Sequence, residues 1–192
     1  MNMDYFVIGR ENCDDYPLLK AADRETSSAV ARTAPLPDEF VAQLQPRPPV
    51  PRHPRWVDFH KMPQPVISAK IVDLLAPLEL PMVQLVKAQI EGADVEGSYH
   101  VLHVMNMISC LDRERSSVAT SRTGAIIEIE RLALDEEVLE QVPEQNRRLF
   151  ILEEDTSVYL VDKGIADLIE SAQPVGLKLY HTSEWHGAVG FD

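Results

Sequence analysis

The apolar run from Tyr99 to Ile108 constrains the fold of this chain more than any other segment. It reads Tyr-His-Val-Leu-His-Val-Met-Asn-Met-Ile, so apolar residues occupy both alternating sets of positions. A strand with that pattern is buried on both faces and lies in the middle of a sheet. Residues Met82 to Ile90 form a second strand-like run, and a polar stretch with Gly92 and Gly97 separates the two. The sequence therefore predicts a β-sheet centred on this pair of strands.

Shorter patterns place other elements around that sheet. Ser68, Asp135 and Asp162 each precede apolar residues at helical spacing, and they are therefore predicted to be helix N-caps. Further strand-like runs occupy residues 5–8, 149–152, 158–161 and 175–179, of which the second and third form a predicted hairpin. The predicted fold class is α+β, with a mainly antiparallel β-sheet, two or three packed helices and a proline-rich N-terminal arm.

The run from Ala125 to Leu134 alternates in part and predicts a half-exposed strand. Ile127 and Ile129 are expected on its inner face, with Glu128 and Glu130 on its outer face. The solvent side of this strand is therefore predicted to be acidic.

Residues 34–65 differ in composition from the rest, because nine of the fourteen prolines lie there. Proline removes a backbone donor and fixes φ, so little regular structure is expected apart from an extended segment at Trp56 to Phe59. The motif from Pro46 to Arg52 fits a polyproline ligand of an SH3-like module. An ordered arm docked through Trp56 and Phe59 is the preferred interpretation, because the motif is short. We expect one domain over residues 1–192, with this arm at 34–65 wrapping the body.

The charge of the chain is uneven. The formal net charge is -13, and residues 128–170 carry thirteen acids against four bases, or -9 of that total. Such a field repels nucleic acid and favours a basic partner. A solvated acidic surface that only maintains solubility is the simpler alternative.

Cysteine content and the first residues bear on the compartment. Cys13 and Cys110 are the only cysteines, which is typical of a reducing compartment. The first residues lack the basic and apolar regions of a signal peptide, and later residues include no apolar run long enough to span a membrane. A cytoplasmic location without membrane contact is expected.

Metal, cofactor and phosphate chemistry find little support in the sequence. His100 and His103 have an H-x-x-H spacing, but an odd separation on a strand directs the two side chains to opposite faces. His181 and His186 lack neighbouring ligands that would complete a metal site. The eight glycines form no phosphate-binding loop. No metal and no cofactor are predicted.

Catalytic patterns are equally weak. Ser109, Cys110 and Ser116 lie near histidines in the sequence but outside any known nucleophile motif. Asp112 and Glu114 allow a carboxylate pair, as in glycoside hydrolysis, although Asp112 is better explained as the cap of a turn.

Asn106 stands within the apolar run from Tyr99 to Ile108. A buried amide needs hydrogen-bond partners, so Asn106 is interpreted as a structural core residue. With no other catalytic pattern, the chain is predicted not to be an enzyme.

Four segments, in order, resemble the bacterial immunity proteins of polymorphic toxin systems, specifically immunity protein family eleven. They are Ile67-Ser-Ala-Lys-Ile-Val-Asp-Leu-Leu75, the run from Tyr99 through Cys110-Leu-Asp112-Arg113, the pair Arg148-Leu-Phe-Ile-Leu152 and Val158-Tyr-Leu-Val161, and the helix before Val175-Gly-Leu177. The resemblance covers residues 66–185, which we take as the family-like core. It implies binding and neutralisation of a cognate toxin, and it supplies no catalytic residue.

An immunity protein associates quickly with its toxin, and a surface of one sign steers that encounter. The candidate toxin-binding residues, called the acidic face below, are Glu128, Glu130, Glu136, Glu137 and Glu140. The partner is then a protein toxin with a basic surface, and the sequence sets no oligomeric state. The alternatives are a non-catalytic adaptor or scaffold of a secretion or phage-like system, which would bind through the proline-rich arm, and a carboxylate-based hydrolase.

Overall fold

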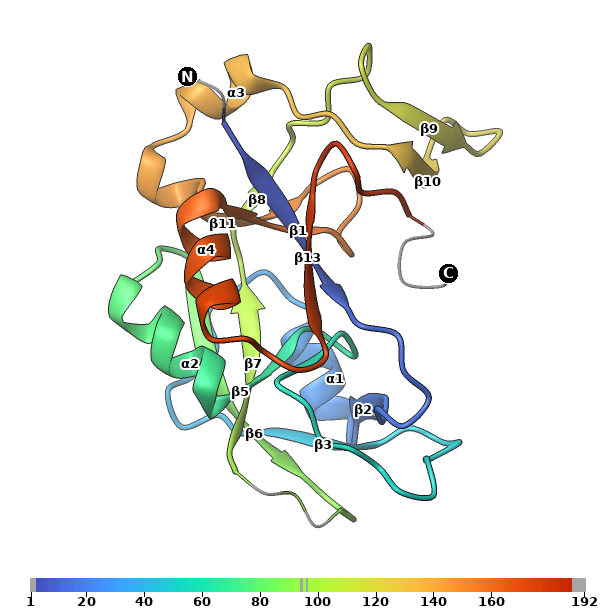
Figure 1. The fold of residues 1–192 in the computed structure, drawn as a ribbon, viewed down its shortest axis with the longest axis vertical. Helices are drawn as coiled ribbons and strands as arrows, with labels where there is room; N and C mark the ends of the chain where they lie inside the picture. The colour runs from blue at the N-terminus through green and yellow to red at the C-terminus, as the bar shows by residue number, and fades with distance from the viewer. Residues whose placement is uncertain (1–2, 94, 96, 188–192) are drawn as a thin grey trace.

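A six-stranded sheet forms one half of the molecule (Figure 1). The computed structural model describes residues 3–93, 95 and 97–187. In spatial order the strands of this sheet are β2 (Leu19–Ala21), β3 (Ala42–Pro46), β6 (Val83–Ile90), β7 (Tyr99–Val104), β5 (Val66–Ser68) and β4 (Phe59–His60). The β6–β7 pair has six registered residue pairs and lies in the middle of the sheet. The predicted central pair of strands is confirmed.

A five-stranded sheet forms the other half. Its order is β13 (Leu177–His181), β1 (Tyr5–Arg10), β12 (Tyr159–Asp162), β11 (Leu149–Leu152) and β8 (Met107–Ile108). The predicted hairpin is β11–β12, and the first strand of the chain pairs with β12 and β13, both antiparallel. Only β3–β6 and β8–β11 are parallel pairs among the described strands. The prediction of a mainly antiparallel α+β fold is confirmed.

The apolar run that was predicted as one strand is divided between the two sheets. It leaves the six-stranded sheet after Val104, and at Met107 it joins the edge of the five-stranded sheet. At the crossing, Asn106 donates from Nδ2 to the carbonyl of Leu149 at 3.4 Å and to that of Asn146. The backbone amide of Ile151 also donates to the carbonyl of Asn106. The predicted structural role of Asn106 is confirmed, because its hydrogen bonds connect the crossing to β11.

Four α-helices are present among the described residues: α1 (Arg24–Val30), α2 (Ala69–Leu75), α3 (Glu136–Gln141) and α4 (Lys163–Ser171). Two 3-10 turns follow α2 and α3, namely η1 (Ala76–Leu78) and η2 (Glu144–Asn146). Asp135 and Asp162 cap α3 and α4 through their side chains, as predicted. Ser68 is the N-cap residue of α2, as predicted, but its side chain makes no capping bond, because its hydroxyl donates to Asp58 at 2.6 Å instead.

The proline-rich stretch contributes more regular structure than its composition predicts. Residues 34–65 include β3 and β4, and β3 lies between β2 and β6 inside the six-stranded sheet. Its one proline, Pro46, is the last residue of the strand, where the loss of a backbone donor is tolerated. The expectation of little regular structure is therefore wrong for Ala42–Pro46.

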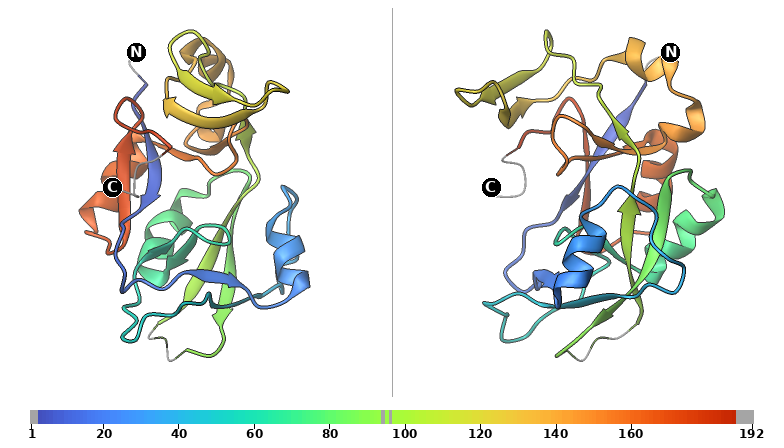
Figure 2. Two further views of the ribbon diagram at one scale, coloured as in Figure 1. Left: turned by 90° about the vertical axis from the view of Figure 1, so that its right-hand side faces the viewer. Right: turned by 180° about the vertical axis from the view of Figure 1, so that it is seen from behind.

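A two-stranded ribbon, β9 (Ser117–Thr120) and β10 (Ile126–Arg131), projects from the end of the molecule that also carries α3 (Figure 2). In β10, Ile126 pairs with Thr120 and Glu128 pairs with Ala119, so Ile127 is an extra residue without a partner. This β-bulge breaks the alternation. Ile129 is fully buried while Ile127 is 69% exposed, and the prediction that both face inward is wrong.

The core has three parts. The largest lies between the sheets and the two adjacent helices α2 and α4, and it includes Ile71, Leu102 and Ile165. A second cluster around Phe150 and Leu139 supports α3 and the base of the ribbon, and a third around Leu44 fills the far side of the six-stranded sheet. The ribbon tip and the outer surface of α3 thus stand outside well-packed regions.

Candidate functional site

The five residues of the acidic face lie on two elements at one end of the molecule (Figure 1). Glu128 and Glu130 are on β10, where both are exposed. Glu130 accepts a hydrogen bond from the hydroxyl of Ser117 at 2.7 Å, across the ribbon. Glu128 lies beside the C-terminal segment, because a Cβ at Gly187 would be 3.3 Å from its Cγ. Both carboxylates are thus held on a narrow, projecting support.

The other three acidic residues are on the short helix α3. Glu137 and Glu140 are exposed, and Glu136 is half-buried. Acids in the first turn of a helix are stabilised by the exposed amides there, so Glu136 and Glu137 also favour the helix itself. These two residues therefore have a structural reason to be acidic besides any binding role.

An open depression of about 690 Å³ contains part of the acidic face. It is lined by Leu111, Asp112, Arg113, Glu114, Arg115, Asp135, Glu136 and Glu137. Glu128, Glu130 and Glu140 do not line it. The structure thus brings two of the five predicted residues together with two arginines, and it places the ribbon pair apart from them. The acidic face is two patches, one of which contains positive charge.

The Asp112 side chain stabilises the turn that follows β8 of the five-stranded sheet. Its Oδ1 accepts from the backbone amides of Glu114 and Arg115, each at 2.9 Å, and its Oδ2 pairs with the Arg115 side chain. The hydrogen bonds from Arg115 hold the pKa of Asp112 below its usual value. Arg115 also donates to the carbonyl of Leu134 at 2.7 Å. The interpretation of Asp112 as a turn cap is confirmed, and a carboxylate with a lowered pKa is a poor general acid.

The candidate nucleophiles are likewise engaged or buried. Burial raises the pKa of the Cys110 thiol to about 12, so it stays protonated near neutral pH. The hydroxyl of Ser109 donates to Glu154 at 2.8 Å, and the hydroxyl of Ser116 is bonded to the backbone of Ala133. These groups have structural roles, since a nucleophile requires an adjacent base and access to substrate.

The histidines of β7 are separated, as their spacing predicts. His103 is buried and bonded through Nε2 to the carbonyl of Ala34 at 2.9 Å, while His100 is only partly buried. His181 bonds Ser183 through Nδ1, and its Nε2 lies 3.7 Å from Asp4. Among the residues with described positions, no three His, Cys, Asp or Glu side chains are grouped to hold a metal ion.

His60 on β4 is a buried histidine that no sequence pattern singles out. It is 2% exposed, its Nδ1 lies 3.0 Å from the carbonyl of Pro17, and its ring packs edge-on against Trp56 and Tyr99. Its Nε2 has no partner among the described residues. Burial lowers the pKa of His60 to about 4, so the ring is neutral at pH 7. Only tertiary contacts distinguish this histidine from an exposed one.

The immunity protein family Imm11 matches residues 10–184, which include the proline-rich stretch and begin well before the predicted family-like core at residues 66–185. The search of curated proteins found no match. No helix within the described parts of the chain has the length and apolar character needed to cross a bilayer.

Proposed function

Because the chain belongs to the Imm11 family of immunity proteins, we propose that it neutralises a cognate bacterial toxin by binding it directly, without catalysis. The match over residues 10–184 carries this proposal, since it spans nearly the whole chain. We place the protein in the cytoplasm of the toxin-producing cell or its kin, as part of a polymorphic toxin system. Binding there protects the cell from the toxin.

The hydrogen bonding and burial of the potentially reactive side chains favour a binding role over a catalytic role. Asp112, Ser109 and Asn106 are each held by hydrogen bonds that close a turn or join two strands. Cys110 is buried and protonated. A catalytic group must be free to exchange a proton or attack a substrate, whereas an inhibitory protein needs only a stable, complementary surface.

The ribbon is the part of the acidic face best suited to a first contact. Glu128 and Glu130 are exposed there, and neither forms an ion pair among the described residues. Unpaired surface charges act at long range and accelerate the approach of a basic partner. We therefore assign these two residues the steering role, with Glu136, Glu137 and Glu140 extending the field along α3.

Ile127 supplies an apolar anchor within the same ribbon. Ile127 lies between Ile126 and Glu128 on β10, and the bulge leaves its large side chain 69% exposed. Bulges often redirect a side chain at a functional edge. A few side chains that are buried in pockets of the partner provide most of the affinity of a typical interface, while surrounding charges set rate and specificity.

Growth of cells that express the toxin encoded beside this protein tests the function. Co-expression of this chain is expected to restore growth, and the two proteins are expected to co-purify as a stable complex. Growth without a complex would indicate another mode of protection, and no rescue with both proteins folded would contradict the proposal.

The rate of association tests the acidic face. In the double variant Glu128→Lys/Glu130→Lys, the association rate with the toxin should fall roughly tenfold at low salt and less at high salt. Asp38→Lys/Glu39→Lys makes the same charge change at exposed positions between α1 and β3, and should leave the rate near wild type. Equal rates for both double variants would reject this placement of the binding surface.

A further inference from the structure

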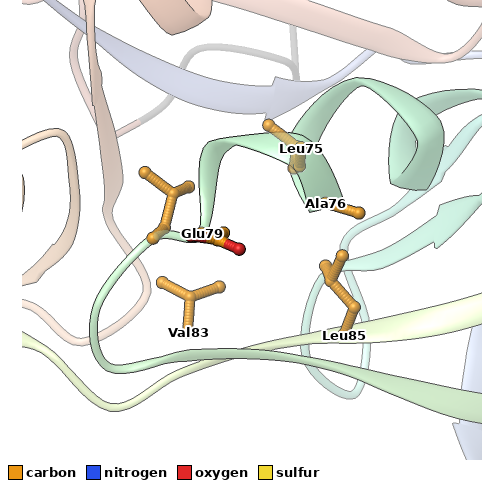
Figure 3. Close-up of a pocket in the computed structure, with 6 residues that line it drawn as sticks. Leu75, Ala76, Glu79, Val83 and Leu85 are labelled. Atoms are coloured by element: carbon orange, nitrogen blue, oxygen red, sulfur yellow. The ribbon is translucent and has the colours of Figure 1, made fainter.

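An apolar groove lies between the α2–η1 segment and the beginning of β6 (Figure 3). Its volume is about 240 Å³, and its lining is Leu75, Ala76, Glu79, Leu80, Val83 and Leu85. Leu75 is buried, Ala76 is exposed, and the other three apolar residues are half-buried. Five of the six residues are therefore aliphatic, and none of them belongs to the acidic face.

The size of the groove favours a protein side chain as its occupant. Sites for small molecules and cofactors usually measure about 300–1,000 Å³ and combine apolar walls with several converging polar groups. This groove is smaller, and Glu79 is its one charged residue. A single aliphatic side chain of a partner suits both its volume and its walls.

The backbone beside the groove is held in an unusual conformation. Glu79 has φ of 45° and Met82 has φ of 59°, although neither is glycine. Left-handed backbone at such residues is costly and tends to persist where function requires a particular presentation. Here it sets the Glu79 carboxylate at the rim of the groove and leaves Met82 50% exposed next to Val83.

The acidic residues at the rim of the groove indicate that the partner residue next to the inserted aliphatic side chain is basic. Glu79 and Asp73 are exposed, and neither carboxylate has a hydrogen bond or ion pair among the residues described. Asp73 precedes Ala76 by three positions, which places it on the same helical face. No cation lines the groove. In a symmetric dimer the same patch would meet itself and bring these acids together, so a second copy is disfavoured.

We propose that the groove receives a leucine-sized aliphatic side chain of the toxin that is followed by a lysine or arginine, which pairs with Glu79. This contact rests on the proposed function and adds a recognition site separate from the acidic face. The occupant is a basic, amphipathic segment of the toxin.

Two matched substitutions test this contact. Ala76→Arg fills the groove and adds a positive charge at an exposed helix C-cap, whereas Ala31→Arg makes the same change at the exposed C-cap of α1. The Kd for the purified toxin should rise at least about tenfold for Ala76→Arg and stay near wild type for Ala31→Arg, because a few well-buried side chains dominate interface affinity. Glu79→Lys at the rim should weaken binding by a smaller factor and provides a second test if Ala76→Arg fails to fold.

The outcomes separate this contact from the proposed function. If wild type binds the toxin and both Ala76→Arg and Glu79→Lys bind equally well, the groove contact is wrong and the immunity function stands. If wild type forms no complex, the function fails and the groove contact falls with it. Sedimentation of the chain alone gives the last outcome, since a wild-type dimer that Ala76→Arg dissociates would assign the groove to a second copy and overturn the proposal.

Discussion

The body of the molecule, where the two sheets meet, and the ribbon at its end use polar residues in opposite ways. In the body, Asn106 donates to the backbone carbonyls of Asn146 and Leu149, and the Asp58 carboxylate accepts from three separate groups. On the ribbon, Glu128 and Glu130 are exposed, and a large aliphatic residue is exposed beside them. Polar groups that are hydrogen-bonded inside the fold stabilise it, whereas exposed carboxylates without an ion pair remain available to a partner.

Two glycines with nearly the same φ extend this comparison of body and ribbon from polar groups to packing, and they carry the largest expected effect. Gly176 has φ of 81° and a Cβ there would lie 2.7 Å from Val57, while Gly124 in the ribbon turn has φ of 83° and nothing within 4 Å. Gly176→Ala should cost about 3 kcal/mol of unfolding free energy from strain and overpacking together, and Gly124→Ala about 1 kcal/mol from strain alone. Chemical denaturation measures both, and equal costs would contradict the difference in packing.

Stability should fall in mild acid because of His60. Its pKa of about 4 lies below the ordinary 6.5, so the unfolded chain binds the proton more readily and the folded state loses stability as pH falls from about 6.5 to 4. The loss from this group is about 3 kcal/mol. His60→Asn retains a donor toward Pro17 and should flatten the dependence by that amount. The same slope in wild type and variant would show that other groups cause it.

Removal of the Asp58 carboxylate should destabilise the fold by about 2 kcal/mol, since it leaves the Ser68 hydroxyl and the Val175 amide without an acceptor. Asp58→Ala tests this loss by thermal unfolding, with Glu128→Ala as the control on the ribbon. The control should change stability by less than about 0.5 kcal/mol, as exposed substitutions usually do. A control as costly as Asp58→Ala would erase the distinction between the two regions.

The smallest expected effect on stability belongs to Glu128→Lys/Glu130→Lys. Both side chains are exposed, so the unfolding free energy should change by less than about 0.5 kcal/mol, although association with the toxin slows. Denaturation of the purified double variant checks this value. A large loss of stability would mean that the ribbon carboxylates serve the fold.

Local chemistry made much of this fold predictable. Asp135 and Asp162 are followed by amides that an N-cap satisfies, so their helices could be placed from short sequences. The strand Ala42–Pro46 was missed because it gains its structure from a parallel partner, β6, more than forty positions further along the chain. Composition around it reflects the loops, which hold most of the prolines.

The candidate site was predictable only in part. The exposure of Glu128 and Glu130 follows from their charge, whereas the exposure of Ile127 depends on how β10 aligns with β9. The burial of His60 depends on Trp56 and Tyr99, and Tyr99 is distant in the sequence. The apolar groove likewise requires α2 to pack near β6.

The adaptor alternative predicts that the proline-rich arm binds the partner, and the structure shows which changes to the arm can test it. Deletion of residues 34–54 would remove β3 from the interior of the six-stranded sheet. Loss of partner binding in that variant would therefore reflect unfolding of the sheet and would not identify the arm as the binding site. Pro48 and Pro49 are exposed and lie outside the strands, so their substitution leaves the sheet intact and tests whether the arm binds a partner.

Titration of the purified toxin with this chain tests direct neutralisation most sharply. Toxin activity should decline in proportion to the chain added and disappear when the two are present in equal amounts, because each bound molecule occupies one toxin. Complete inactivation by a small fraction of an equivalent would contradict neutralisation by binding and indicate catalysis, and undiminished activity at excess chain would contradict the immunity function itself.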